Sequence, residues 1–377
     1  MVNYPDDWKR KQLKDIGYIQ MCRRIFQHQT STSGEIPFYK ISTFGGKADV
    51  YITRKLYEEY RDKYPYPQKG DILLSAAGTI GRTVIFNGED AYFQDSNIVW
   101  LNVNKKFIDT RYLYWFYLSN PWHSLEGTTI QRLYNKTILD TEIYLPPIPE
   151  QTAIATALSD MDSLIDSLRQ LIAKKKNIRQ GAMQELLTGK RRLPGFEGEW
   201  RETLLYDVAD RFDNLRVPIS ADKRVRGYTP YYGANGIQDY VNGYTHNGEY
   251  VLIAEDGAND LQHYPIRYVC GKIWANNHVH VLQGKHNVIY TKFLSYVLTC
   301  VNFESILVGG TRAKLNAKSL MRIKIYIPVK VKEQQAISET IYDMELEISA
   351  LQTQLQKYEN IKKGMMEKLL TGQIRLV

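Results

Sequence analysis

The chain has few cysteines and none of the residue patterns that usually mark a metal site. Its 377 residues include three cysteines, Cys22, Cys270 and Cys300, which have no metal-binding spacing. An odd number of widely separated cysteines is typical of reduced residues in a cytoplasmic protein rather than of a disulfide framework. The seven histidines form no HExxH motif. We therefore expect no metal ion on this chain.

Motifs for catalysis are missing as well. Asn120-Pro121-Trp122 lacks the second proline of the Asn/Asp-Pro-Pro-aromatic tetrapeptide that an adenine methyltransferase needs. Gly45-Gly46-Lys47 lacks the spacing of a phosphate-binding loop, and the glycines at 309–310 are not followed by such a loop either. A self-sufficient nuclease or methyltransferase is therefore disfavoured, although turnover by the purified chain alone would revive that alternative.

Long apolar runs are also absent. No stretch of about 18 apolar residues suggests a membrane span, and residues 1–8 lack the apolar core of a signal peptide. We expect a cytoplasmic protein with no membrane partner. The net charge of +8, from 49 basic and 41 acidic residues, favours a polyanionic partner.

A repeat is the most informative feature that is present. Residues 174–193 and 357–376 align without gaps, and a repeat this far apart indicates two copies of one unit. Two similar halves suggest approximate two-fold symmetry, which double-stranded DNA shares, so a two-fold DNA reader is an immediate candidate. The identical positions in the first copy include Asn177, Ile178, Gly181, Met183, Leu186, Leu187, Thr188, Gly189, Arg192 and Leu193.

Each repeat ends a stretch in which apolar residues recur at alternating steps of four and three. This heptad spacing predicts two long amphipathic helices with one apolar seam each. Pro149 and Glu150 suit the first turn of the first helix, and Thr188-Gly189 suits its end. The expected helix–helix seam consists of Ile154, Leu158, Met161, Ile165, Leu168 and Ile172 in the first helix and Ile337, Ile341, Met344, Ile348, Leu351 and Leu355 in the second.

The fold that these patterns predict is α+β. Two globular α/β domains are joined by the two long helices, which form an antiparallel coiled coil with pseudo-two-fold symmetry. The alternative is that each helix packs on its own domain. The expected segments are a first domain at 1–148, a first helix at 149–189, a linker with a second domain at 190–330, and a second helix at 331–377.

The chain resembles the specificity subunit of a type I DNA restriction-modification enzyme over its full length. The resemblance rests on an ordered double set of motifs. Leu-Pro-Pro-Ile-Pro-Glu-Gln at 145–151 enters the first helix, and Leu-Leu-Thr-Gly-Lys-Arg-Arg-Leu at 186–193 leaves it, followed by Trp200. Glu333-Gln334 and Leu-Leu-Thr-Gly at 369–372 repeat the pattern. The second half lacks the double proline, at Ile-Pro-Val-Lys 327–330.

The resemblance implies a non-catalytic subunit with two target-recognition domains. Each domain would read one half of a bipartite target in double-stranded DNA. The helices would dock two modification (methyltransferase) subunits and set the spacer between the two halves. Those partners would carry S-adenosylmethionine for adenine-N6 methylation, and restriction subunits that use ATP and Mg could join them for cleavage. No cofactor is expected on this chain itself.

Candidate DNA contacts are chosen by side-chain chemistry. Residues 75–82 follow a strand, residues 127–132 and 309–314 are Gly-Thr-basic loops at equivalent positions, and two asparagines stand in the second domain. Basic side chains suit guanine edges or phosphates, while Gln and Asn suit adenine edges. For each residue the alternative is a solvated loop. The candidates are Thr79, Arg82, Thr128, Gln131, Arg132, Asn276, Asn277, Thr311, Arg312 and Lys314.

A different class of function also fits the long helices. A coiled-coil scaffold whose end domains bind proteins would show the same periodicity. Weak, salt-insensitive binding of DNA by the assembled complex would favour that alternative, because contacts to phosphates make binding depend on salt.

Overall fold

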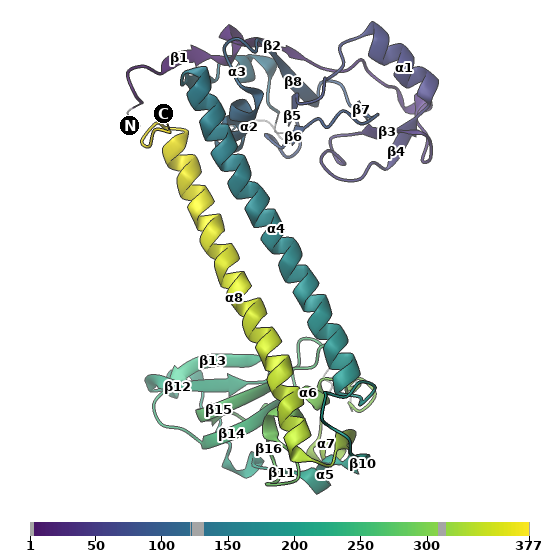
Figure 1. The fold of residues 1–377 in the computed structure, drawn as a ribbon, viewed down its shortest axis with the longest axis vertical. Coiled ribbons are helices and arrows are strands. Elements are labelled where there is room, and N and C mark those ends of the chain that lie inside the picture. Colours follow the sequence, from purple (N-terminus) through teal and green to yellow (C-terminus); the bar gives the residue numbers. More distant parts are fainter. Residues whose placement is uncertain (1–3, 121, 123–131, 308–313, 377) are drawn as a thin grey trace. The chain divides into compact units, whose positions relative to one another are not determined.

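The computed structural model describes residues 4–120, 122, 132–307 and 314–376. The chain forms two compact units (Figure 1). Unit 1 comprises Met1–Arg169 and Gln354–Val377, and unit 2 comprises Gln170–Thr353. Each unit therefore contains one globular domain and a part of both long helices.

The globular part of unit 1 is rich in short strands. The strands are β1 (Lys9–Gln12), β2 (Gly17–Gln20), β3 (Ile36–Tyr39), β4 (Val50–Ile52), β5 (Ile72–Ser75), β6 (Thr83–Ile85), β7 (Tyr92–Phe93), β8 (Ile98–Val103) and β9 (Glu142–Leu145). The helices are α1 (Arg54–Lys63), α2 (Thr110–Ser119) and α3 (Asn135–Leu139), with 3-10 turns η1 (Leu13–Asp15) and η2 (Gln27–Gln29).

Unit 1 contains three small sheets. Their strand orders are β2-β8-β5-β6, β4-β3-β7 and β1-β9. Two apolar clusters hold them: one packs Trp115 of α2 with Ile154 and Leu369 of the long helices, and the other surrounds Trp100 and Tyr92. Helix starts follow local capping chemistry, as at α1, where the Thr53 hydroxyl accepts a hydrogen bond from the amide of Leu56.

The globular part of unit 2 has longer strands. They are β10 (Trp200–Leu204), β11 (Ala209–Arg211), β12 (Arg226–Gly233), β13 (Gly236–Val241), β14 (His246–Ala254), β15 (Ile266–Ala275), β16 (Val279–Gly284) and β17 (Lys324–Pro328). The helices are α5 (Leu205–Val208), α6 (Thr291–Leu298) and α7 (Ala317–Met321), with η3 (Asp213–Leu215) and η4 (Ala221–Lys223).

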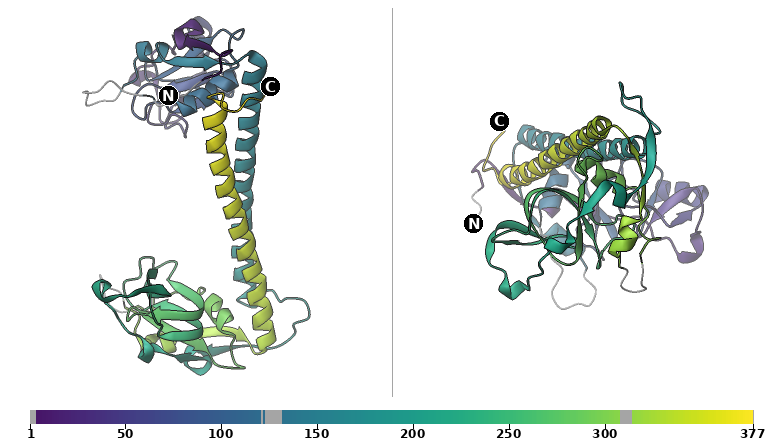
Figure 2. Two further views of the ribbon diagram at one scale, coloured as in Figure 1. Left: turned by 90° about the vertical axis from the view of Figure 1, so that its left-hand side faces the viewer. Right: turned by 90° about the horizontal axis from the view of Figure 1, so that it is seen from below.

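Unit 2 is organised around one six-stranded sheet of order β11-β16-β14-β15-β12-β13. Its core packs the helix α6 against that sheet, which Figure 2 shows in two further views. Phe293 and Leu294 of α6 are fully buried. A separate pair, β10-β17, corresponds to β1-β9 of unit 1. In both units this antiparallel pair joins the first strand of the domain to the strand that precedes a long helix.

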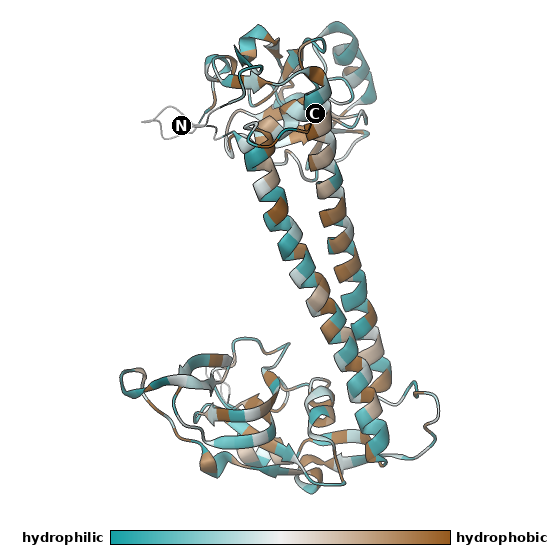
Figure 3. Ribbon diagram, turned by 60° about the vertical axis from the view of Figure 1, so that its left-hand side comes forward, coloured by the Kyte–Doolittle hydropathy of each residue, from teal (hydrophilic) through white to brown (hydrophobic). Residues whose placement is uncertain are grey.

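The two long helices are equal in length, and the second ends at Leu369, before the expected bound of 377. α4 runs Ile148–Leu186 and α8 runs Val331–Leu369, each 39 residues, with apolar residues recurring along both (Figure 3). Beyond each end a glycine adopts positive φ, +71° at Gly189 and +70° at Gly372, as a helix-terminating motif requires. A Cβ on Gly189 would also lie 3.1 Å from the ring of Trp200. None of the described helices is apolar over a length that could cross a bilayer.

Segments of α4 and α8 pair in opposite directions within each unit. In unit 1 an ion pair joins Asp162 to Lys362, and Arg169 lies 2.6 Å from Glu359. In unit 2 Lys175 lies 2.6 Å from Glu347, and further along α4 Arg179 lies 3.3 Å from Glu345. As the residue number rises along α4, it falls along α8, which is the antiparallel order that we expected.

The expected seam divides into two kinds of packing. The first apolar residues of each helix belong to the core of a domain, as the alternative held: Ile154 and Leu158 in unit 1, and Ile337 and Ile341 in unit 2. The remaining residues of the expected seam come later in each helix and are buried or half-buried: Met161, Ile165, Leu168 and Leu355 in unit 1, and Ile172, Met344, Ile348 and Leu351 in unit 2. The domains therefore account for the burial of the first residues of each helix, while the helix–helix seam formed by the following residues stays a prediction.

A buried glutamate lies in the first turn of each long helix, and it accepts hydrogen bonds from the same residue types in both units. In unit 1, Glu150 accepts hydrogen bonds from Arg375 Nε (2.5 Å) and Nη2 (2.7 Å) and from the indole of Trp8 (3.2 Å). Its side chain has no solvent exposure. We call this set of three residues the clasp. It joins the start of one long helix, the segment after the other, and the beginning of the domain.

The clasp of unit 2 repeats this geometry. Glu333 accepts hydrogen bonds from Arg192 Nε (2.5 Å) and Nη2 (2.7 Å) and from the indole of Trp200 (3.3 Å). The next residue is a buried glutamine, which makes an equivalent hydrogen bond in both units. Gln151 donates to the carbonyl of Pro146 at 2.9 Å, and Gln334 donates to that of Pro328 at 2.9 Å. The repeated Glu-Gln pair thus fixes how each domain meets its helix.

Removing one clasp carboxylate should strongly destabilise the unit that contains it. Glu150→Ala removes the buried partner of Arg375, which keeps only the more exposed Asp7, so we expect the free energy of opening of β8 amides to fall by about 3 kcal/mol. Glu333→Ala should do the same to β14. Hydrogen exchange measures the free energy of opening in both strands. The control is Glu367→Ala at an exposed position of α8, which should change either free energy by less than about 0.5 kcal/mol. Unchanged protection in the clasp variants would contradict the role assigned to these carboxylates.

Candidate nucleic-acid interface

Three segments of unit 1 that are distant in sequence meet at the end of β5. The amide of Ala76 donates to the carbonyl of Asn97 at 2.7 Å, and the amide of Leu133 donates to the carbonyl of Ala76 at 2.8 Å. An isolated bridge pairs Ala77 with Arg132. We call this meeting point the junction of unit 1. It places the start of β8 and the segment after residue 131 beside the loop that follows β5.

Unit 2 has a junction of the same construction at the end of β14. The amide of Glu255 donates to the carbonyl of His278 at 2.9 Å, and the amide of Leu315 donates to the carbonyl of Glu255 at 2.8 Å. The isolated bridge here pairs Asp256 with Lys314. Ala76 of unit 1 therefore corresponds to Glu255, and Arg132 corresponds to Lys314.

Candidate DNA contacts lie at or next to both junctions. Arg132 and Lys314 occupy equivalent bridge positions and are both exposed. Thr79 is exposed in the loop after β5, where its carbonyl accepts a hydrogen bond from the Ser75 hydroxyl. Arg82 follows in the same loop, and its Nη1 donates to the carbonyl of Phe44 at 2.6 Å.

The two asparagines of the second domain have different environments. Asn277 is exposed in the turn before β16. Asn276 is 3% exposed, and its side-chain oxygen accepts a hydrogen bond from the amide of His278, so this side chain shapes the turn instead of facing solvent. The remaining candidates, Thr128, Gln131, Thr311 and Arg312, lie outside the described residues.

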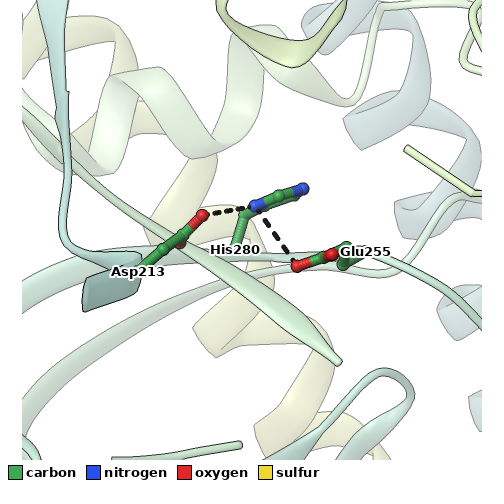
Figure 4. A group of neighbouring side chains, drawn as sticks. All are labelled: Asp213, Glu255 and His280. Carbon is green, nitrogen blue, oxygen red and sulfur yellow. Dashed lines mark hydrogen bonds and ion pairs between the residues drawn. The ribbon is translucent and has the colours of Figure 1, made fainter. Parts of the chain in front are cut away.

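A cluster of charged side chains fills the junction of unit 2 (Figure 4). His280 Nδ1 lies 2.7 Å from Asp213 Oδ2 and 3.8 Å from Glu255 Oε2. Its Nε2 faces the carbonyl of Leu315 at 2.8 Å. Both ring nitrogens of His280 therefore face oxygen atoms.

Cations on neighbouring segments offset the two carboxylates of this cluster. Arg211 lies 2.8 Å from Asp213, while Arg216 and Lys314 lie 2.6 and 2.9 Å from Glu255. Burial would raise the pKa of Asp213, but hydrogen bonds from His280 and the amide of Val281 outweigh it and hold that pKa at about 2. Burial likewise opposes ionisation of Glu255, whose pKa is nevertheless lowered by hydrogen bonds from Arg216 and Lys314.

The same cluster contains the residue types that bind metal ions. Asp213, Glu255 and His280 each offer one ligand atom, all within 4.8 Å of one another, and among the described residues this is the one such group. However, two arginines and a lysine already neutralise its carboxylates. A metal ion would have to displace these cations, so the chemistry of the group favours an internal ion-pair network.

Sequence reasoning missed this network and also the turn before β8. His280 stands two residues after His278, where unit 1 has Val99 two residues after Asn97, and nothing in the periodicity marks that difference. A usable signal did exist in unit 1. Asp95-Ser96-Asn97 is a run of turn-forming residues directly before a buried strand, which is where polar side chains commonly gather.

Comparison with known families and relatives gives one consistent result. The family described as the type I restriction modification DNA specificity domain matches residues 5–176 and 197–362. A putative type I restriction enzyme specificity subunit of Haemophilus influenzae is 49% identical over 170 residues, which span 45% of this chain and 44% of that protein. A type I restriction enzyme specificity subunit of Methanocaldococcus jannaschii is 24% identical over 100% of this chain and 95% of its own length.

Solved structures give the same result for the fold. The S subunit of a type I restriction-modification system from M. genitalium aligns with a TM-score of 0.69 at 18% identity, covering 98% of this chain and 97% of that one. The HsdS subunit from Thermoanaerobacter tengcongensis aligns with a TM-score of 0.52 at 15% identity, covering 99% and 98%. At these identities the likeness concerns the fold.

The Asp213 network should make the stability of unit 2 depend on acid. The folded-state pKa of Asp213 is about 2, below the unfolded value of about 3.9. Its stabilisation, about 2 kcal/mol, is therefore complete above about pH 4 and is lost as the pH falls towards 2. At pH 6, hydrogen exchange in β16 should give a free energy of opening that is higher in the wild type than in Asp213→Asn by this amount. The difference should become smaller as the pH approaches 2.5. A difference that does not depend on pH would contradict this assignment.

Proposed function

This chain belongs to the DNA specificity family of type I restriction-modification systems, and we propose that each of its units reads one half of a bipartite DNA target. Specificity subunits are the non-catalytic, DNA-recognising components of these systems. The observation that carries the proposal is the pair of equivalent junctions. They share one backbone frame but present different side chains, as two readers of different half-sites would.

Differences at equivalent positions support this division of labour. The residue before the bridge is Ala76 in unit 1 and Glu255 in unit 2, and only the second can neutralise the basic side chain beside it, as it does with Lys314 at 2.9 Å. Arg132 of unit 1 instead contacts the carbonyl of Ser96. Because hydrogen-bonding groups distinguish base edges, two such surfaces would select different sequences.

We also propose that the long helices bind two modification subunits. Two open grooves support this, about 950 Å³ in unit 2 and about 830 Å³ in unit 1. Each is lined by the end of one long helix, by the other long helix, and by α6 or α2. The lining residues fall at equivalent repeat positions: Arg179 and Lys362, Gln180 and Lys363, Met183 and Met366, Thr188 and Thr371. Equivalent grooves suit two copies of one partner.

The chemistry of the assembled complex follows from these partners. We propose that the modification subunits supply S-adenosylmethionine and methylate adenine, and that restriction subunits supply ATP- and Mg-dependent cleavage where they are present. The length of the paired helices would set the spacer between the half-sites. The complex would act in the cytoplasm, where chromosomal and incoming DNA meet. This chain would contribute target choice and assembly.

Mapping N6-methyladenine across the genome of the source organism, with and without this gene, tests the proposed function. Loss of methylation at one split, asymmetric motif is the expected result, because the partners would have lost their reader. An unchanged pattern, with the gene shown to be expressed, would contradict the proposal. That outcome would favour the alternative of a scaffold whose domains bind proteins.

Blocking one groove should remove one partner copy. Gln180→Trp and Lys363→Trp add a bulky ring at exposed, equivalent positions of the two grooves. Native mass spectrometry of the chain with its modification subunit should show two copies for the wild type, one for either variant and none for the double variant. Lys174→Trp, exposed on α4 outside both grooves, is the control. Two copies on the double variant would contradict groove docking.

A further inference from the structure

An open groove of about 790 Å³ lies beside the junction of unit 1. It is lined by the segment after β2, by β3 and β4, by the turn before β8, and by Arg132. Its lining is mainly polar, and it includes the buried apolar residues Ile25 and Phe38 and the exposed polar residues Arg24 and Gln27. Exposed hydrogen-bond donors beside apolar side chains suit the edge of a base pair, which offers hydrogen-bonding groups and the thymine methyl group.

The turn before β8 accepts hydrogen bonds from both arginines of this groove. Asp95 Oδ2 accepts hydrogen bonds from Arg24 Nε at 2.9 Å and from the Ser96 hydroxyl at 3.1 Å. The carbonyl of Ser96 in turn accepts a hydrogen bond from Arg132 Nη2 at 3.5 Å. Arg24 and Arg132, which are far apart in sequence, are therefore both set by the Asp95-Ser96 turn.

Ser96 adopts a backbone conformation that is unusual for its residue type. Its φ is +59°, in the left-handed region that side chains other than glycine rarely occupy. Such conformations persist only where the surroundings enforce them, and they concentrate at functional sites. Here the conformation directs the Ser96 carbonyl towards one arginine while Asp95 holds the other.

Arg24 is oriented while its terminal nitrogens stay available. Its side chain is 61% exposed, and within the described part of the chain its only hydrogen bond is the one from Nε to Asp95. The two Nη groups form a planar fork that matches O6 and N7 of guanine in the major groove. A carboxylate behind Nε fixes the plane of that fork, which is the preorganisation that selective readout needs.

The corresponding place in unit 2 is chemically different. There Glu255 and His280 bring ionisable side chains into the junction, where unit 1 has Ala76 and Val99. The network of unit 2 uses its own basic residues internally, whereas the groove of unit 1 presents an arginine fork to solvent. Among the described residues, the reading surface proposed here therefore lies in unit 1.

We propose that Arg24, oriented by Asp95, reads a guanine edge in the half-site recognised by unit 1, with Arg132 placed to contact the adjoining phosphate. This inference rests on the proposed function of the units. It adds a specificity-determining residue and its target: the guanine at one base pair of the half-site. The two parallel donors of arginine match a guanine edge better than the single ammonium of lysine does, whereas a phosphate accepts either cation.

The test compares Arg24→Ala and Arg24→Lys in the full chain, co-expressed with the modification subunit of its own system in a host without adenine methylation. Arg61→Ala is a matched control, because Arg61 Nε also bonds an aspartate, Asp62 at 3.1 Å, but on α1 away from the groove. Methylation is mapped genome-wide. We expect both Arg24 variants to relax the requirement at one G·C pair of one half-site by about 10-fold or more.

The other half-site should keep its sequence in both Arg24 variants, which shows that the chain is folded and assembled. Arg61→Ala should leave both halves unchanged. An unchanged motif in Arg24→Ala, or full rescue of selectivity by Arg24→Lys, would overturn base reading by Arg24. Failure of the wild-type chain to give any bipartite motif would instead contradict the proposed function, so the two failures are distinguishable.

Discussion

A buried carboxylate held by an arginine and a tryptophan is the interaction on which each unit depends. Glu150 and Glu333 are almost fully buried, and an unpaired charge at either position would be costly. Each therefore requires its arginine, which follows the end of the other long helix. In unit 1 the partners Glu150 and Arg375 are 225 residues apart in sequence. The clasp thus makes both long helices obligatory parts of each unit.

This constraint separates what is repeated from what is free to vary. The clasp, the glutamine beside it and the helix stops recur with nearly the same distances in both units. At the junctions the backbone hydrogen bonds recur as well, but the side chains do not. A fixed frame that presents variable side chains is what a family of DNA readers needs, since a new specificity then requires few changes to the packing.

The elements predicted best were those with local signals. Heptad spacing predicted α4 and α8, and Thr188-Gly189 predicted where α4 ends, because both patterns act through neighbours along the helix. Equivalent placement of Arg132 and Lys314 followed from the repeat. In contrast, the burial of Glu150 was not predictable, because it depends on partners supplied by distant segments.

The candidate contacts show the same limit. Asn276 has suitable chemistry for a base edge, but the turn before β16 buries it and uses its oxygen for a backbone amide. The sequence did not mark Arg24 as a candidate contact, because a single basic residue in a loop has no periodicity. The role proposed for it depends on its hydrogen bond to Asp95 and on the positive φ of Ser96. Reading surfaces assembled from several loops need the fold before they can be recognised.

The central claim is that the two units share one backbone arrangement and that each recognises its half of the DNA target independently. Exchanging residues 1–148 for the corresponding domain of another family member, and then mapping methylated adenines, tests it most directly. The account predicts that one half of the bipartite motif changes to that of the donor while the other half is retained. A change in both halves, or in neither, would contradict it.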